Sequence, residues 1–158
     1  MEKKGHYCFR ALVEWRGKMT FKPEQKEKLK VILDSNALFV PLQFRIDVFS
    51  ELERLLNRNF ELILLSSVKR ELEILAEKGA PKMRKSACCA LKFAERCRLV
   101  EVGASASALT DDVIVKVAGE WGSPVFTNDK QLRKRLRDIS VPVIYVRQKS
   151  RLEIDGLI

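Results

Sequence analysis

Acidic residues that follow short apolar runs are the side chains in this sequence most suited to chemistry. Each run is short enough for a buried strand. An acid comes either directly after a run or in the first turns of the helical pattern that follows it. The five acids are Asp34, Glu71, Asp111, Asp112 and Asp129. Because ligands bind beyond the carboxyl ends of parallel strands, we expect these acids to meet at one edge of a sheet.

Carboxylates that share one crevice repel one another, and a divalent cation removes that cost. Mg²⁺ or Mn²⁺ fits best, because these ions take oxygen ligands and keep several waters. Such ions lower the pKa of a bound water and stabilise charge on a phosphate. The pattern therefore predicts hydrolysis of phosphodiester bonds without a histidine.

Helix capping is the alternative explanation for these acids, since the helix macrodipole favours acids in first turns. For Asp111 alone, capping explains the position equally well. Glu71 does not complete a capping box, because Ser67 lies four residues before it and not three. Asp34 gains little from capping, because Pro41 delays the next periodic helix.

Other catalytic classes lack the residues that they need. His6 is the only histidine, so a two-histidine nuclease is excluded and a Ser-His-Asp or Cys-His site would have to recruit that residue. No phosphate-binding P-loop motif is present. An aspartyl-phosphate mechanism at Asp34 is disfavoured, because Asn36 stands where a D-x-D motif needs its second aspartate. The four cysteines form no C-x-x-C pair, which indicates reduced thiols.

Short apolar strands alternate with amphipathic helices from residue 29 onward, which is typical of parallel βαβ units. We predict an α/β fold, a three-layer α/β/α sandwich with a central, mostly parallel five-stranded sheet. The nuclease domain is predicted at 29–148, between an extension at 1–28 and a tail at 149–158. The expected strands are 31–33, 62–65, 99–102, 125–126 and 141–146, and the expected helices are 44–56, 68–78, 81–94, 110–121 and 132–139.

Composition favours a soluble protein with an anionic partner. The 158 residues are 46% hydrophobic and 32% charged, with a net charge of +9. Apolar runs are far shorter than a membrane span, and we expect a cytoplasmic location without membrane contact. A basic set beside Asp129 is predicted to bind the RNA backbone, although a solvated helix face explains such a run equally simply. Its members are Lys130, Arg133, Lys134, Arg135 and Arg137.

At the acidic positions the sequence resembles a PIN domain over roughly residues 30–148. The start Val31-Ile32-Leu33-Asp34-Ser35-Asn36 resembles the family's hydrophobic-D-x-[NST] motif. Three later segments resemble those that carry its other acids, and they are Ser66 to Leu72, Thr110 to Ile114 and Thr127 to Leu132. The resemblance implies that four acids bind Mg²⁺ or Mn²⁺ and that Asn36, Thr127 and Asn128 support them. We place Asp112 first, as the aspartate of the family's D-x-x-I pattern, with Asp111 assisting.

The double aspartate and the ending at 141–148 are similar to the archaeal branch of the family. That branch is similar to eukaryotic endonucleases that process ribosomal RNA, and it shares its fold with VapC-type toxins, which cleave tRNA or rRNA. The resemblance therefore implies an RNA substrate, with an antitoxin or a ribosome-assembly partner and a homodimer as further expectations. The leading hypothesis is a metal-dependent endoribonuclease. The alternative is an RNA-binding or ribosome-assembly module with weak or no nuclease activity.

Overall fold

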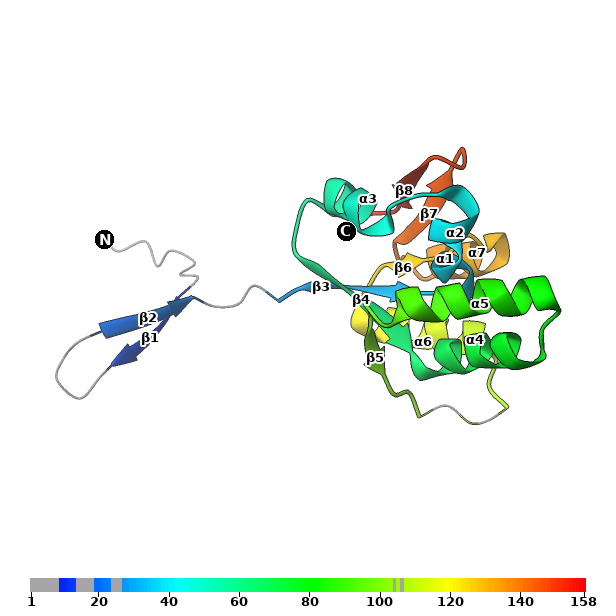
Figure 1. Ribbon diagram of the computed structural model, residues 1–158. Helices are drawn as coiled ribbons and strands as arrows, with labels where there is room; N and C mark the ends of the chain where they lie inside the picture. Colours follow the sequence, from blue (N-terminus) through cyan, green and yellow to red (C-terminus); the bar gives the residue numbers. More distant parts are fainter. Residues whose placement is uncertain (1–8, 14–18, 24–26, 104, 106) are drawn as a thin grey trace.

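The computed structural model describes residues 9–13, 19–23, 27–103, 105 and 107–158. Near the N-terminus, β1 (Phe9–Val13) and β2 (Met19–Pro23) pair as an antiparallel sheet of their own. The rest of the described chain builds a sheet of six strands with helices around it (Figure 1).

The six-stranded sheet has the order β5-β4-β3-β6-β7-β8. Its first five strands in this order run parallel, and β8 is antiparallel to β7. The strand bounds are β3 Leu29–Leu33, β4 Phe60–Leu65, β5 Arg98–Val100, β6 Val125–Phe126, β7 Val143–Arg147 and β8 Arg151–Asp155. The predicted α/β architecture with a mostly parallel sheet is confirmed.

The carboxyl-terminal halves of the central strands are apolar because helices cover both of their faces. Val31, Ile32 and Leu33 of β3 are fully buried, as are Val125 and Phe126 of β6. The helices around them are α1 Ser35–Leu38, α2 Val40–Phe44, α3 Val48–Leu56, α4 Ser66–Lys78, α5 Pro81–Ala94, α6 Thr110–Trp121 and α7 Lys130–Asp138. Helix α4 packs against α5, and α6 packs against α7. No helix within the described ranges is long and apolar enough to cross a bilayer.

The predicted helix at 44–56 is wrong in its start, because the chain forms separate short helices there. Arg45 ends α2 in the left-handed region, with φ of 54°. Asp47 then caps α3, and its carboxylate accepts a hydrogen bond from the Ser50 amide. A residue other than glycine in the left-handed region gives only a weak sequence signal. The apolar spacing alone therefore predicted one continuous helix across the break.

The predicted number of five strands is also wrong, because β8 adds a sixth at 151–155. Gln148 and Lys149 form the turn before it, with φ of 53° and 56°. Backbone with positive φ normally carries Gly, Asn or Asp, and none of these stands at either position, so the usual signal for a hairpin turn was missing. Leu152 is the one fully buried residue of β8, which left too little apolar pattern to recognise.

Candidate active site

Asp34 and Thr127 lie side by side at the carboxyl edge of the sheet. Strands β3 and β6 pair in parallel, with Leu33 opposite Phe126, so the next residue of each strand is also a neighbour. The Thr127 hydroxyl donates a hydrogen bond of 2.8 Å to Asp34 Oδ2. Thr127 is fully buried and Asp34 is 4% exposed. The edge where acids were expected to gather is therefore occupied by a nearly buried carboxylate.

The Asp34 carboxylate also accepts hydrogen bonds from its own chain neighbours. The Ser35 amide donates to Oδ1 over 2.7 Å, and Asn36 Nδ2 donates to Oδ2 over 2.9 Å. Asp34 is the N-cap of α1. The expectation that capping matters little at Asp34 was wrong, because helix α1 is too short to show an apolar period before Pro41.

Asn36 and Asn128 connect the loops that follow β3 and β6. Asn36 Oδ1 accepts a hydrogen bond of 3.0 Å from the Asn128 amide. Asn128 Oδ1 in turn accepts one of 2.8 Å from the Val146 amide in β7. The Asp129 amide donates to Thr127 Oγ1 over 3.1 Å. These bonds hold three neighbouring loop segments in register around Asp34.

Glu71 approaches the site from the second turn of α4. Ser35 Oγ donates a hydrogen bond of 3.3 Å to Glu71 Oε1. The negative charge of Glu71 also acts on the Asp34 carboxyl. Ser35 was not among the predicted site residues, although its place between Asp34 and Asn36 was a signal that could have found it.

Asp111 and Asp112 point to different surroundings. The charges of Asp34 and Asp129 interact with that of Asp111, which is half-buried. Asp112 Oδ1 accepts a short hydrogen bond of 2.6 Å from Arg135 Nη2, and its side chain is 53% exposed. Counted along the chain, D-x-x-I begins at Asp111 and ends at Ile114, so our assignment of that pattern to Asp112 was an error.

Asp129 has a capping role as well as a place near the site. Its Oδ1 accepts hydrogen bonds from the Gln131 and Leu132 amides, over 2.7 Å and 3.2 Å, at the start of α7. Capping therefore explains why an aspartate stands at this position. It does not explain why Asp129 stands close enough to Asp111 for its charge to raise the pKa of that carboxyl.

Burial and mutual repulsion raise two carboxyl pKa values in this site. The pKa of Asp34 is raised to about 6, chiefly by burial. Hydrogen bonds from Thr127 and Ser35 oppose that shift, while the charges of Asp111 and Glu71 add to it. Burial, then the charge of Asp129, also raises the pKa of Asp111. A bound cation would relieve both costs.

The donor set of the site fits a hard divalent cation. The Asp34 carboxylate lies beside the Thr127 hydroxyl, and oxygen atoms of these kinds are the ligands that Mg²⁺ and Mn²⁺ prefer. Over the described ranges, no three His, Cys, Asp or Glu side chains are close enough to form a finished ligand cluster. An ion that keeps several waters needs only one or two carboxylates, and Mg²⁺ binds in this way.

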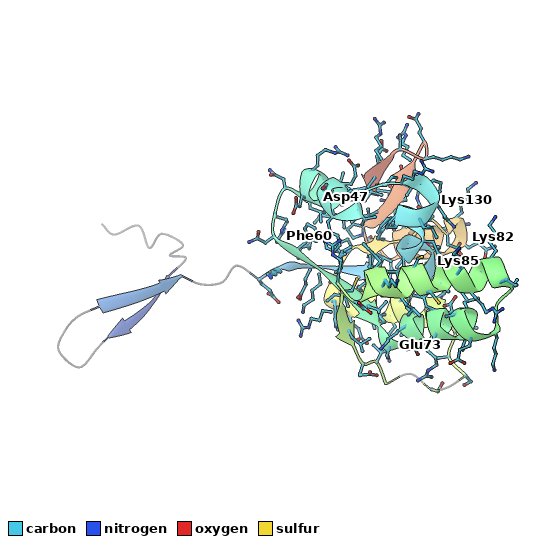
Figure 2. All side chains as sticks on the ribbon, viewed as in Figure 1. Asp47, Phe60, Glu73, Lys82, Lys85 and Lys130 are labelled. Atoms are coloured by element: carbon cyan, nitrogen blue, oxygen red, sulfur yellow. The ribbon has the colours of Figure 1, made fainter. Side chains whose placement is uncertain are left out.

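Structural ion pairs occupy part of the predicted basic set on α7. Arg133 and Arg137 both pair with Asp155 of β8, over 3.3 Å and 2.8 Å. Arg135 pairs with Asp112. Lys130, which begins α7 and is labelled in Figure 2, and Lys134 are both exposed. RNA binding by this helix stays a prediction that depends most on its lysines.

Residues 31–149 match the family model described as a PIN like domain. The chain belongs to this family. The matched segment contains β3 to β7 and every acid of the site. The prediction of PIN-family membership is confirmed.

Two archaeal ribonucleases are similar to this PIN chain over most of its length. Ribonuclease VapC4 of Methanocaldococcus jannaschii is 34% identical over 134 residues, which cover 82% of this chain and 98% of that protein. Ribonuclease VapC9 of Archaeoglobus fulgidus is 29% identical over 126 residues, covering 80% and 89%. The solved structure of the PIN domain endonuclease Utp24 is 28% identical, with a TM-score of 0.69, and the match covers 82% of this chain and 92% of that one.

Three cysteines are free thiols, as the sequence indicated. Cys88 and Cys89 are exposed on α5, and Cys97 is half-buried. Burial raises the pKa of the Cys97 thiol to about 12. Cys8, like His6, lies outside the described residues.

Proposed function

We propose that this PIN-family protein is a metal-dependent endoribonuclease. The observation that carries the proposal is the nearly buried Asp34, whose carboxyl is acted on by the charges of Asp111 and Glu71, in a chain whose curated relatives are named ribonucleases. A bare acidic cluster would be costly to fold, so it favours a site that a cation completes.

Asp34, Glu71, Asp111 and Asp129 are the proposed carboxylates of an Mg²⁺ or Mn²⁺ site, in which one or two of them would bind the ion directly and the others would act through its waters. Asp112 is placed outside this set because it pairs with Arg135. When bound, the cation would lower the pKa of a water and stabilise charge on the phosphate. Thr127 and Asn36 hold the Asp34 carboxylate in one orientation by hydrogen bonds. Ser35 does the same for Glu71.

The substrate is proposed to be RNA, with rRNA and tRNA as the two targets that the family resemblance implies. The VapC names of two relatives favour an antitoxin partner, and the similarity to Utp24 favours a role in rRNA processing. A homodimer stays a prediction. Size-exclusion chromatography with light scattering tests it, and a single peak at the mass of the 18.2 kDa monomer would contradict it.

Cleavage of labelled, structured RNA with Mn²⁺, with Mg²⁺ and with EDTA tests the proposal. Wild-type protein should cleave internal bonds with either ion and not with EDTA. Asp34→Asn should be inactive, whereas Asp138→Asn, an exposed aspartate at the end of α7, should cleave like wild type. Cleavage that survives EDTA or persists in Asp34→Asn would refute the metal mechanism. Binding of RNA without any cleavage would favour an RNA-binding or assembly module.

A further inference from the structure

A basic pocket lies beside the acidic site, between the start of α7 and the β7–β8 hairpin. We call it the hairpin pocket, and its volume is about 540 Å³. A cavity of this size holds a ligand as large as a nucleotide. The residues that define it are Phe44, Asn128, Lys130, Tyr145, Arg147 and Lys149.

Cations dominate the walls of the hairpin pocket. Lys130 and Lys149 are exposed, and within the described part of the chain neither forms an ion pair. Arg133 also lines the pocket, and no described acidic side chain does. The hairpin pocket therefore suits an anion such as a phosphate group.

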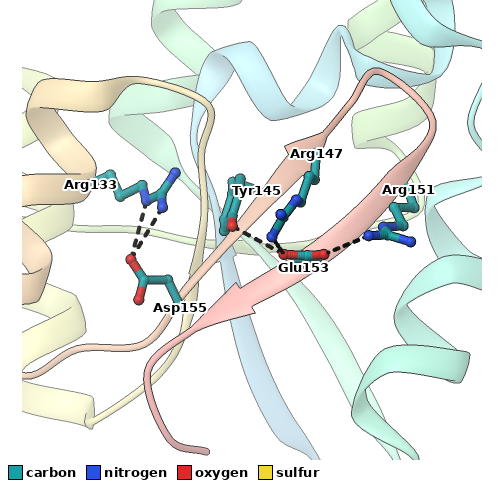
Figure 3. A network of polar contacts seen from close by, with 6 residues as sticks. All are labelled: Arg133, Tyr145, Arg147, Arg151, Glu153 and Asp155. Atoms are coloured by element: carbon teal, nitrogen blue, oxygen red, sulfur yellow. Dashed lines mark hydrogen bonds and ion pairs between the residues drawn. The ribbon is translucent and has the colours of Figure 1, made fainter.

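Tyr145 gives the pocket an aromatic wall that is already held in place. The Arg133 guanidinium lies 3.8 Å from the centre of the Tyr145 ring. The Tyr145 hydroxyl donates to Glu153 Oε2 over 3.2 Å, and Arg147 binds the same oxygen over 2.7 Å (Figure 3). Arg133 is fixed in turn by Asp155. Aromatic rings and arginine planes are the surfaces on which unpaired RNA bases stack.

Asn128 joins the hairpin pocket to the acidic site. Its amide donates to Asn36 beside Asp34, while its side chain accepts from Val146 in the pocket wall. On either side of it, Thr127 orients the Asp34 carboxylate and Asp129 is one of the proposed metal-site acids. A strand of RNA with one phosphate at Asp34 would thus reach the pocket within its neighbouring nucleotides.

We infer that the hairpin pocket binds single-stranded RNA next to the bond that is cut. Lys130 and Lys149 contact backbone phosphates, and a base stacks against the aromatic wall. This inference rests on the proposed ribonuclease function and adds the place where the flanking nucleotides are held. Combined charge and stacking are typical of sites that bind single strands without strict sequence preference.

Fluorescence anisotropy with a labelled oligouridylate of about ten nucleotides tests the inference, a length that spans a typical single-strand site. EDTA is present so that the RNA stays intact. Lys130→Ala/Lys149→Ala should weaken binding about ten-fold and reduce the log–log salt slope by about 1.4, which is about 0.7 for each lost phosphate contact. Tyr145→Leu should weaken binding by about ten-fold with an unchanged salt slope, because stacking carries no charge.

Lys92→Ala/Lys116→Ala is the matched control, because it removes two exposed lysines from α5 and α6. An equal loss in this control would overturn the inference, since general surface charge would then explain binding. The inference would also be overturned if Lys130→Ala/Lys149→Ala bound RNA with wild-type affinity but lost affinity for polyglutamate. That result would indicate a site for an acidic protein.

Cleavage assays with Mn²⁺ separate this inference from the proposed function. If wild-type protein cleaves RNA but the pocket variants bind RNA as tightly as wild type does, the pocket inference is refuted and the proposed nuclease function is not. If wild-type protein does not cleave RNA, but RNA affinity falls in the pocket variants and not in the control, the nuclease function is refuted. The hairpin pocket is then supported as an RNA-binding site.

Discussion

The Thr127 hydroxyl donates to Asp34 Oδ2 over 2.8 Å although the two residues are 93 positions apart in the chain. The same hydroxyl accepts a hydrogen bond from the Asp129 amide. Thr127 thus couples the nearly buried carboxylate of β3 to the loop that starts α7. Both partners of the bond are buried, so its loss leaves the Asp34 carboxylate with one hydrogen bond fewer where little water can replace it.

Removal of the Thr127 hydroxyl should weaken both folding and the site. Thr127→Val keeps the shape of the side chain but cannot donate to Asp34, and we expect a loss of about 1–3 kcal/mol in the free energy of unfolding. Thr127→Ser keeps the hydroxyl and should stay nearer to wild type. Urea denaturation of the three proteins measures the effect. Equal stability of the valine and serine variants above about pH 7, where Asp34 is ionised, would show that the bond does not stabilise the fold.

The raised pKa of Asp34 predicts a pH-dependent stability. An acid whose pKa is about 6 in the folded protein, against 3.8 unfolded, holds its proton longer when folded. The folded state binds more protons between these values, so stability falls as the pH rises through this window. Relative to Asp34→Asn, wild-type protein in EDTA should lose about 1–3 kcal/mol between about pH 4 and pH 7.

Urea denaturation of both proteins over this range measures the difference. The comparison cancels shifts shared by wild type and variant, such as the lowered pKa values of Glu51 and Glu153. A constant difference between the two proteins would contradict the raised pKa. Addition of Mn²⁺ above about pH 6 should restore stability to wild type alone, because the ionised carboxylate then has a partner.

Asp111→Asn and Asp112→Asn form a matched pair of adjacent substitutions. The charge of Asp111 interacts with those of Asp34 and Asp129, so its variant should lose about a hundred-fold in kcat/KM with Mn²⁺. Asp112→Asn loses only an exposed ion pair with Arg135, so its free energy of unfolding should fall by less than about 1 kcal/mol and it should stay active. RNA cleavage rates measure both effects. The reverse order of activities would restore Asp112 as the principal ligand.

Cysteine reactivity should follow exposure and pKa. Cys97 has a pKa of about 12 and is half-buried, so almost none of it is thiolate near pH 8. Iodoacetamide should therefore alkylate Cys88 and Cys89 in the folded protein well before Cys97. Peptide mass mapping over time resolves these positions, and the denatured protein, in which all three react alike, is the control. Early labelling of Cys97 would indicate local opening of the segment after α5.

Sequence reasoning placed the acids at the sheet edge because it needed only local signals. Apolar runs such as 31–33 indicated buried strands, and the acid that follows each run was read directly from the chain. Parallel strands bring their carboxyl ends to one edge, so the common edge of the segments that follow β3 and β6, which begin with Asp34 and Thr127, followed from topology alone. The α/β fold and the candidate acids could therefore be predicted from patterns a few residues long.

Tertiary structure alone decided which of those acids share an environment. Asp111 and Asp112 are adjacent in the chain, but only the packing of α6 against α7 pairs Asp112 with Arg135. Tertiary placement also brings the charge of Asp111, and not that of Asp112, to act on Asp34. Strand β8 likewise depends on long-range partners, since Glu51 of α3 accepts a hydrogen bond from the Leu152 amide 101 residues away. Contacts of this kind depend on side-chain direction and on the three-dimensional placement of distant elements. A pattern of neighbouring residue types holds no information about either.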